Sequence, residues 1–330
     1  MSNITIKTTD STITMANLWD HFLARWGYKR NEHSIDPGIY AIGNPNPDSP
    51  VFVTANYTLS FDSLRSSIKG INAYILVLDT NGVNVWCAAG KETFGTNELV
   101  HRIEVTGLSN IVKHKSLILP QLGAPGVSAH QVKERTGFKV EYGPVRASDL
   151  PEYLKNHKST KEMRTIYFPL LDRIVLIPVE LVQGMFPAII LAIISLLIGG
   201  FMGLWSSIVA VLTGMVLFPI LLPWIPTKYF STKGFILGGI AALPFAISAF
   251  THYQTTALWF QICASFIYLL VMPPITAFLA LNFTGATTFT SRTAVKNEIF
   301  YYVPVMAIMF GTSILLIITL SAIKIFGGSL

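Results

Sequence analysis

Cysteine is almost absent from this sequence of 330 residues, which contains only Cys87 and Cys263. Two cysteines are too few for a disulfide framework, and too few for an iron–sulfur cluster, which takes about four thiolates. Charged residues are also scarce, at 13% of the chain, and the basic ones are dispersed, with several beside apolar segments. Such a distribution favours contact with anionic lipid headgroups and not with nucleic acid.

A secretory signal is a second feature that the sequence lacks. Residues 1–30 carry charges throughout and contain no apolar core followed by small residues, so we expect the amino-terminal part to stay in the cytoplasm. No run before Met185 is long and apolar enough to cross a bilayer. From Met185 onward we predict about five spans, because a helix needs roughly 20 apolar residues to cross the hydrocarbon core. They cover approximately residues 185–204, 207–225, 234–250, 258–283 and 299–326.

The basic residues between these runs predict their orientation. Lys228 and Lys233 lie between the second and third runs, and Arg292 and Lys296 between the fourth and fifth. By the positive-inside rule the amino terminus and these loops are cytoplasmic and the carboxyl terminus lies outside. We therefore expect a multi-pass protein of the cytoplasmic membrane.

Three parts follow from these patterns. Residues 1–168 form a cytoplasmic domain, residues 169–184 a juxtamembrane linker or interfacial helix, and residues 185–330 an all-α transmembrane domain. The middle segment is apolar but contains Asp172, Arg173 and Glu180, so it fits both an interfacial helix and a longer first span.

The first part alternates short β-rich runs with helical patterns, which is typical of an α/β fold with a mainly parallel, Rossmann-like sheet. Helices are expected at residues 61–68 after a Ser60 cap, around Cys87, and at residues 98–108, 128–136 and 148–156, the last opened by Ser148. The predicted strands are residues 51–54, 74–79, 117–119 and 138–142, with a further candidate at 165–168.

Four strand ends are polar, glycine-rich or both. They read TANY, DTNGVNVWCAAGK, PQLGAPG and GPVR. Because ligands of open α/β sheets bind beyond the carboxyl ends of the strands, we expect all four segments to line one crevice.

Cys87 lies within the second of these segments. Thr80, Asn81 and Gly82 form a turn signal, and Asn84 can cap a short helix in which Cys87 is the third residue. Unpaired N–H groups and the positive end of the helix dipole would favour the thiolate there. Cys87 is thus a candidate ligand or nucleophile, although a buried structural cysteine is the alternative. Cys263 lies in the middle of an apolar run and is interpreted as structural.

The string NVWCAAGK at residues 84–91 resembles the cap-helix motif of mercury-methylating corrinoid proteins (the HgcA family). Residues 54–65, 120–130 and 142–149 are also similar to that family and to the corrinoid domain of the corrinoid iron–sulfur protein of acetyl-CoA synthesis. The resemblance covers most of residues 17–168. A five-helix membrane tail is what separates the first family from the second.

The resemblance implies a corrinoid, cobalamin-type cofactor whose cobalt takes the Cys87 thiolate as its axial ligand. A soft thiolate is a strong donor and would favour transfer of a cobalt-bound methyl group to Hg(II), by a carbanion or a radical route. The implied activity is a corrinoid-dependent methyltransferase that forms methylmercury, within anaerobic one-carbon metabolism. No Asp-x-His-x-x-Gly string, which would supply a histidine ligand instead, occurs in the chain.

Further cofactor contacts are expected around Cys87. Trp86 would pack on the ring or on the sheet, Lys91 would meet the cofactor tail or only solvent, and Gly123 and Gly126 would allow close approach of the backbone unless they form an ordinary turn. His130 is interpreted as a helix or tail contact. The other candidates are Thr54, Asn56, Thr80, Asn84, Val85, Ala88, Pro120, Gln121, Ala124, Val127, Gly143 and Pro144.

The expected lack of an iron–sulfur cluster in this chain implies partner proteins. With no iron–sulfur cluster expected in this chain, low-potential electrons must come from another protein. The resemblance implies a ferredoxin-like iron–sulfur protein, HgcB in that family, as reductant and Hg(II) carrier, together with a methyl-tetrahydrofolate-type donor system.

Two other functions remain open at this point. The first is a corrinoid methyl carrier with another acceptor, since no residue here recognises mercury. The second is a membrane transporter with a cytoplasmic regulatory domain, which several prolines in the apolar runs allow and the scarcity of intramembrane charge disfavours.

Overall fold

The computed structural model divides the chain into two compact units, Met1–Tyr167 and Phe168–Leu330. Residues 254–255, between the third and fourth expected apolar runs, lie outside the part that is described. The structure describes residues 5–29, 32–253, 256–287 and 290–326.

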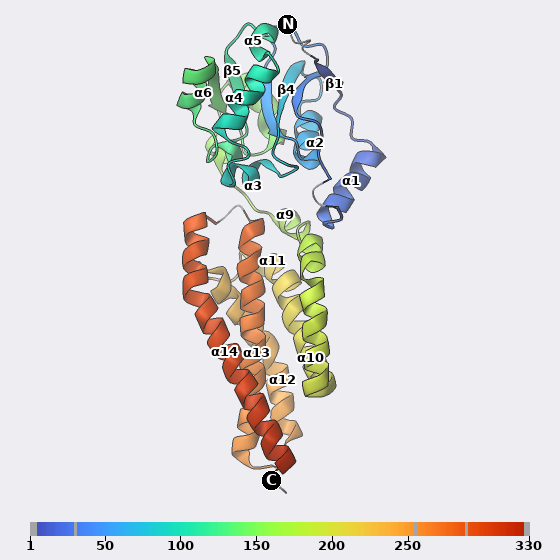
Figure 1. Cartoon of the computed structure of the whole chain (residues 1–330), viewed down its shortest axis with the longest axis vertical. Helices are drawn as coiled ribbons and strands as arrows, with labels where there is room; N and C mark the ends of the chain where they lie inside the picture. Colours follow the sequence, from blue (N-terminus) through green and yellow to red (C-terminus); the bar gives the residue numbers. More distant parts are fainter. Residues whose placement is uncertain (1–4, 30–31, 254–255, 288–289, 327–330) are drawn as a thin grey trace. The chain divides into compact units, whose positions relative to one another are not determined.

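The first unit contains a sheet of six strands in the order β1-β2-β4-β3-β5-β6 (Figure 1). Strands β4, β3, β5 and β6 are parallel to one another, β2 runs antiparallel to β4, and β1 is parallel to β2. The mainly parallel α/β fold is therefore confirmed. The strands are β1 (Lys7–Thr9), β2 (Gly38–Ile42), β3 (Val51–Ala55), β4 (Ala73–Leu78), β5 (Ser116–Leu119) and β6 (Lys139–Tyr142).

Two predictions about local structure in this unit are wrong. The candidate strand at residues 165–168 is irregular and does not belong to the six-stranded sheet. Ser60 and Ser148 do not cap helices: Ser60 lies inside α2 (Thr58–Ser67), and Ser148 lies in a short 3₁₀ turn before α7 (Leu150–Asn156). The expected strands at 51–54, 74–79, 117–119 and 138–142 correspond to β3, β4, β5 and β6.

Helices cover both faces of the sheet. Alternate residues of β4 point to opposite sides, so that Leu76 and Leu78 pack with α3 to α6 while Ile75 and Val77 pack with α2 and α7. Both faces of the central strands are therefore buried, as their nearly continuous apolar runs predict. The helices of this unit are α1 (Met15–Arg25), α2 (Thr58–Ser67), α3 (Val85–Gly90), α4 (Thr96–Val105), α5 (Leu108–Ile111), α6 (Ala129–Thr136), α7 (Leu150–Asn156) and α8 (Lys161–Arg164).

The second unit is helical. Among the described residues, four helical segments are long and apolar enough to cross a membrane: Leu170–Leu221, Phe230–His252, Leu258–Ala286 and Thr293–Phe326. They are built from α9 (Leu170–Ile174), α10 (Ile177–Leu212), a π-helical turn (Thr213–Leu217), α11 (Phe218–Leu221), α12 (Phe230–His252), α13 (Leu258–Asn282) and α14 (Arg292–Phe326).

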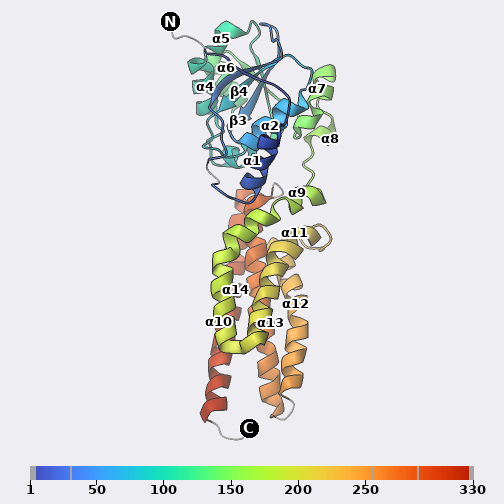
Figure 2. The ribbon, with the colours of Figure 1, turned by 90° about the vertical axis from the view of Figure 1, so that its right-hand side faces the viewer.

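The first of these segments is broken at Gly200. Its 52 residues would extend about 78 Å as one straight helix, far more than a hydrocarbon core of about 30 Å. Gly200 has non-helical backbone angles (φ 58°, ψ −153°), and the chain reverses direction there (Figure 2). A Cβ on Gly203 would lie 2.2 Å from the Ser195 carbonyl oxygen. The reversal falls inside the expected run 185–204, which is thus divided between two antiparallel arms, and residues 207–221 of the expected run 207–225 belong to the second arm.

Helices α12 and α13 pack closely through small residues. Gly234 and Gly238 are four residues apart on one face of α12, and a Cβ on them would lie 2.5 Å and 2.7 Å from the Cα atoms of Ala277 and Pro273. This is the small-xxx-small arrangement that lets helix backbones approach in a membrane.

Among the described residues of the second unit, three ionisable side chains are buried, and each contacts the end of a helix. Arg173 donates to the carbonyls of Pro219 and Ile220, at the carboxyl end of the first apolar segment. Lys233 donates to the Leu222 carbonyl, two residues after Ile220. Glu298 accepts from the Ser231 N–H at the amino end of α12. Cations at helix carboxyl ends and an anion at an amino end are favourable, so these charges stabilise the bundle.

Candidate functional site

Cys87 lies on the outward side of helix α3, directly after the turn that follows β4. The helix buries Val85, Ala88 and Ala89, whose spacing places them on one face. Cys87 is half-buried on the other side, and Lys91 follows it four residues later, which places it on the same face. The sulfur is therefore presented at the carboxyl edge of the sheet, and Cys87 is not a core residue.

Asn84 caps this helix as the sequence predicts. Its backbone is extended, and its side-chain oxygen accepts the Cys87 N–H at 2.9 Å. Cys87 is the third helical residue. The Cys87 amide is thus engaged by the cap, so it is not one of the unpaired N–H groups expected at the start of this helix.

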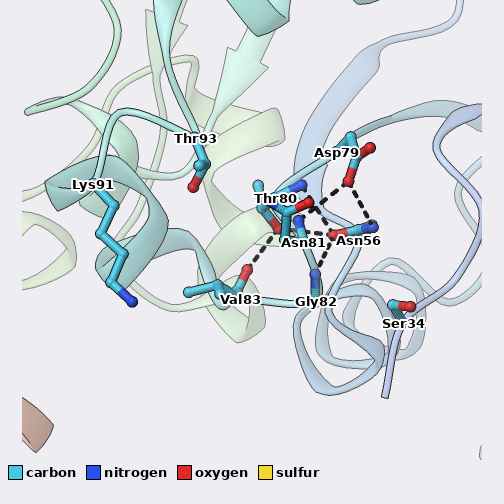
Figure 3. A pocket seen from close by; sticks show the side chains of 9 residues that line it. All are labelled: Ser34, Asn56, Asp79, Thr80, Asn81, Gly82, Val83, Lys91 and Thr93. Atoms are coloured by element: carbon cyan, nitrogen blue, oxygen red, sulfur yellow. Dashed lines mark hydrogen bonds between the residues drawn. The ribbon is translucent and has the colours of Figure 1, made fainter. Parts of the chain in front are cut away.

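An open pocket of about 540 Å³ lies beside α3 (Figure 3). Its walls come from the end of β3, the turn after β4 and the carboxyl end of α3. Ser34 contributes from the side opposite Lys91. The lining residues are Ser34, Asn56, Asp79, Thr80, Asn81, Gly82, Val83, Lys91 and Thr93.

Asn56 organises the floor of this pocket. Its side-chain oxygen accepts from the Thr80 N–H (3.0 Å), the Thr80 hydroxyl (2.8 Å) and the Gly82 N–H (3.0 Å). Its amide nitrogen donates to Asp79 at 3.3 Å. Asn56 and Thr80 are both buried, so they fasten the turn after β4 to the end of β3 and set where α3 begins.

The residue types in the turn after β4 explain its conformation. Asn81 and Gly82 both have positive φ, at 55° and 68°, and the Val83 N–H donates to the Thr80 carbonyl at 3.1 Å. Two central residues with positive φ define a type I′ turn, for which Asn-Gly is a favoured pair. The Thr80 hydroxyl also lies 2.7 Å from the Val83 carbonyl, so its single proton is shared between two acceptors.

The glycines after β5 serve a different contact from the one expected. A Cβ on Gly123 would lie 2.6 Å from the Phe94 ring, and one on Gly126 would lie 2.2 Å from the Phe94 carbonyl oxygen and 3.0 Å from the Ala89 Cα. Both therefore allow the loop 120–127 to approach the segment that ends α3. Their close approach is to the protein's own backbone and core.

Gly126→Ala is expected to destabilise the first unit by about 1–3 kcal/mol, since the added methyl group forces backbone atoms apart. Gly90→Ala is the matched control, because a Cβ there meets nothing within 4 Å and alanine favours a helix. Thermal unfolding of both variants, followed by near-ultraviolet circular dichroism, measures the difference. Equal midpoints for the two variants would contradict the close contact at Gly126.

The ends of β5 and β6 are joined across this edge. The Gly143 N–H donates to the Leu119 carbonyl at 2.8 Å, and the Gln121 N–H to the Pro144 carbonyl at 3.3 Å. Burial raises the pKa of Tyr142, so its hydroxyl stays protonated and donates to the Val127 carbonyl at 2.6 Å. The four strand ends therefore lie at one edge, but of the four predicted segments only TANY and DTNGVNVWCAAGK contribute residues to the pocket.

The remaining predicted residues divide by exposure. Trp86 is half-buried on the outward side of α3, and His130 is exposed, with its Nδ1 3.0 Å from the Ser128 hydroxyl. Lys91 is exposed and lines the pocket. Buried positions are Thr54, Val85, Ala88, Gly123, Val127, Gly143 and Pro144, and half-buried ones are Pro120, Gln121, Ala124 and Gly126.

Six pocket residues were not among the predicted contacts: Ser34, Asp79, Asn81, Gly82, Val83 and Thr93. Four of them belong to the stretch DTNGV, so the Asn-Gly turn signal that identified the bend also marked the pocket. Ser34 pairs with Tyr57 through an isolated bridge between distant segments. No local pattern in the sequence marks that contact.

Comparison with known proteins places similarity in the first unit. Residues 26–154 match the family of the CO dehydrogenase/acetyl-CoA synthase delta subunit. The acetyl-CoA decarbonylase/synthase complex subunit gamma of Methanothermobacter thermautotrophicus is 34% identical over 129 residues, which are 38% of this chain and 27% of that protein. The same subunit of Archaeoglobus fulgidus is 32% identical over 135 residues, 40% of this chain and 28% of that protein.

These matches span about a quarter of the length of the curated relatives. The family match over residues 26–154 includes β2 to β6, helix α3 and every residue that lines the pocket, and Cys87 lies inside it. The α/β unit of this chain is therefore similar in sequence to subunits of acetyl-CoA synthase and decarbonylase/synthase complexes, throughout the edge that carries Cys87.

Proposed function

We propose that the first unit binds a corrinoid through the Cys87 thiolate and that the chain is a methyltransferase that passes a methyl group to Hg(II). The observation that carries the proposal is the outward-facing thiol of Cys87 on a capped helix, at a strand-end edge within the family match. The NVWCAAGK motif and the apolar second unit are the features that favour mercury over acetyl-CoA synthesis.

The residues at this edge fit such a cofactor in their donor chemistry. A half-exposed thiol supplies a soft ligand suited to cobalt. The pocket beside α3 is open and lined by amide, hydroxyl, carboxylate and ammonium groups that can bond to the polar substituents of a corrinoid. When bound, the cobalt centre supplies the ability to accept a methyl group and hand it on.

The chain's own residues position this ligand. Asn84 fixes the first turn of α3 through the Cys87 amide, and Asn56 fixes the turn from which α3 starts. Ala88 and Ala89 hold the helix against the core. Partners that hold a metal ligand in orientation contribute as much as about 10–100-fold to affinity or activity. Asn56 and Thr80 therefore act as positioning residues.

The visible spectrum of the purified full-length chain, mixed with hydroxocobalamin in detergent, tests cofactor binding. Coordination by a thiolate should give a spectrum distinct from the water-ligated and base-ligated forms of the free cofactor. A spectrum identical to that of the free cofactor would contradict the proposal and favour a transporter with a regulatory domain.

The acceptor needs a separate experiment. In a chain reconstituted with methylcobalamin, a Hg(II)–thiol complex should produce methylmercury in step with loss of methyl from the cofactor. If the rate of methyl loss is the same with and without Hg(II), the chain is a methyl carrier for another acceptor. The proposed donor system is of the methyl-tetrahydrofolate type, and the proposed partner is a ferredoxin-like protein such as HgcB.

A further inference from the structure

Helix α1 carries an apolar stripe that faces away from the first unit. Its residues follow the spacing i, i+3, i+4, i+7 and i+11, which places them on one side of a helix. Trp19 stacks on Phe22, and Phe22 contacts Trp26 (ring centroids 5.3 and 5.8 Å apart). The exposed fractions are 80% for Met15, 49% for Leu18, 62% for Trp19, 47% for Phe22 and 41% for Trp26.

The opposite side of α1 fixes this orientation through polar contacts. Asp20 accepts from His33 and from the Thr58 hydroxyl, both at 2.7 Å. His21 lies 2.8 Å from the buried carboxylate of Asp62. Helix α1 thus lies beside α2 with its polar side inward (Figure 2). This is the reverse of an ordinary surface helix, and rotating α1 would break both carboxylate contacts.

The chemistry of the stripe and its surroundings favours a lipid surface as the occupant. Tryptophan and phenylalanine are typical of helices that lie in the membrane interface. Two basic residues, Arg25 and Lys29, lie at one end of the stripe, and both are exposed. Lys29 also pairs with Glu32 at 2.9 Å. Basic residues of this kind are attracted to anionic headgroups.

The covalent connection of the unit keeps such a surface within reach. The first unit ends at Tyr167, and the first apolar helical segment begins at Leu170. A tether this short gives the unit a high effective concentration at any bilayer that the apolar helices cross. An exposed apolar stripe on a unit tethered in this way has a nearby partner of matching chemistry.

We propose that α1 is an interfacial anchor, whose apolar stripe inserts into the headgroup region of an anionic bilayer and holds the first unit at the membrane surface. The inference is independent of the cofactor, because no α1 residue lines the pocket or belongs to the Cys87 edge. It adds a second membrane contact to a chain whose only other candidate contacts are in the second unit, within the described residues.

Site-directed spin labelling of the full-length chain in proteoliposomes tests this anchor. A nitroxide is attached at Met15→Cys, in a chain that also carries Cys87→Ser and Cys263→Ser, with vesicles of phosphatidylcholine and phosphatidylglycerol. Lys133→Cys, an exposed position on α6, is the matched control. At position 15 we expect the nitroxide to be more accessible to oxygen than to a water-soluble nickel complex, at a depth of roughly 5–10 Å. At position 133 the order should reverse.

Two results would overturn the anchor. Equal accessibility to the nickel complex at positions 15 and 133 would place the stripe in water. A label at position 15 that neither reagent reaches would show that protein, either another part of this chain or a partner, covers the stripe. Anionic headgroups should contribute to this anchoring. We therefore expect the oxygen accessibility of the label at position 15 to fall when Arg25→Gln and Lys29→Gln are added, or when phosphatidylglycerol is omitted.

Discussion

Cys87→Ala is expected to abolish the thiolate-bound visible spectrum and to lower methyl transfer by more than about 100-fold, since loss of a ligand should exceed the 10–100-fold cost of losing its supporting bonds. The substitution should leave the fold intact. Cys87 is half-buried on the outward side of α3, and alanine is the best helix former. The loss would therefore report chemistry and not unfolding.

Cys263→Ala is the matched control for this experiment. Cys263 packs in the second unit beside the cluster formed by Phe260, Ala264 and Leu320. The Cys263→Ala variant should retain both the thiolate-bound visible spectrum and the methyl-transfer activity. A Cys87→Ala chain with the wild-type spectrum would remove Cys87 from the cobalt, whereas wild-type spectra with lost activity in both variants would point to a general defect.

Asn56→Ala should produce the largest loss of stability at the site. The Thr80 and Gly82 amides are buried donors to the Asn56 oxygen. Leaving a buried donor unsatisfied costs about 1–3 kcal/mol each, so a total of about 2–6 kcal/mol is expected. Hydrogen exchange measured by mass spectrometry should show greatly reduced protection of the turn after β4 and of α3.

Asn72→Ala supplies the comparison. Asn72 is exposed, and its side chain accepts one backbone N–H, that of Asn44 at 2.9 Å. Its removal should cost no more than about 0.5–1.5 kcal/mol, with no change of protection near α3. Similar losses in the two variants would show that the Asn56 network does not hold the turn.

The central strands could be predicted because each is a short apolar run between turn residues. Their shared carboxyl edge then followed from parallel pairing alone. Strands β1 and β2 were not predicted. β1 has three residues, and β2 is antiparallel to β4, so neither belongs to the βαβ pattern that guided the prediction.

The residues around Cys87 also predicted helix α3. Asn-Gly specifies the turn, and Asn84 at the cap position specifies where α3 begins. The roles of Gly123 and Gly126 were not predictable in the same way, because a glycine in a sequence does not reveal what occupies the space that a Cβ would fill. Here Phe94 and Ala89 occupy it, and both come from another segment of the chain.

The contact at Gly126 has a mechanical consequence. Since the loop 120–127 lies directly against Ala89 and Phe94, and its Val127 carbonyl is bonded to Tyr142 on β6, α3 cannot shift without displacing that loop. A force that pulls on Cys87 is thus transmitted across the edge to the end of β6. We therefore expect helix α3 and the loop 120–127 to move together as one rigid body.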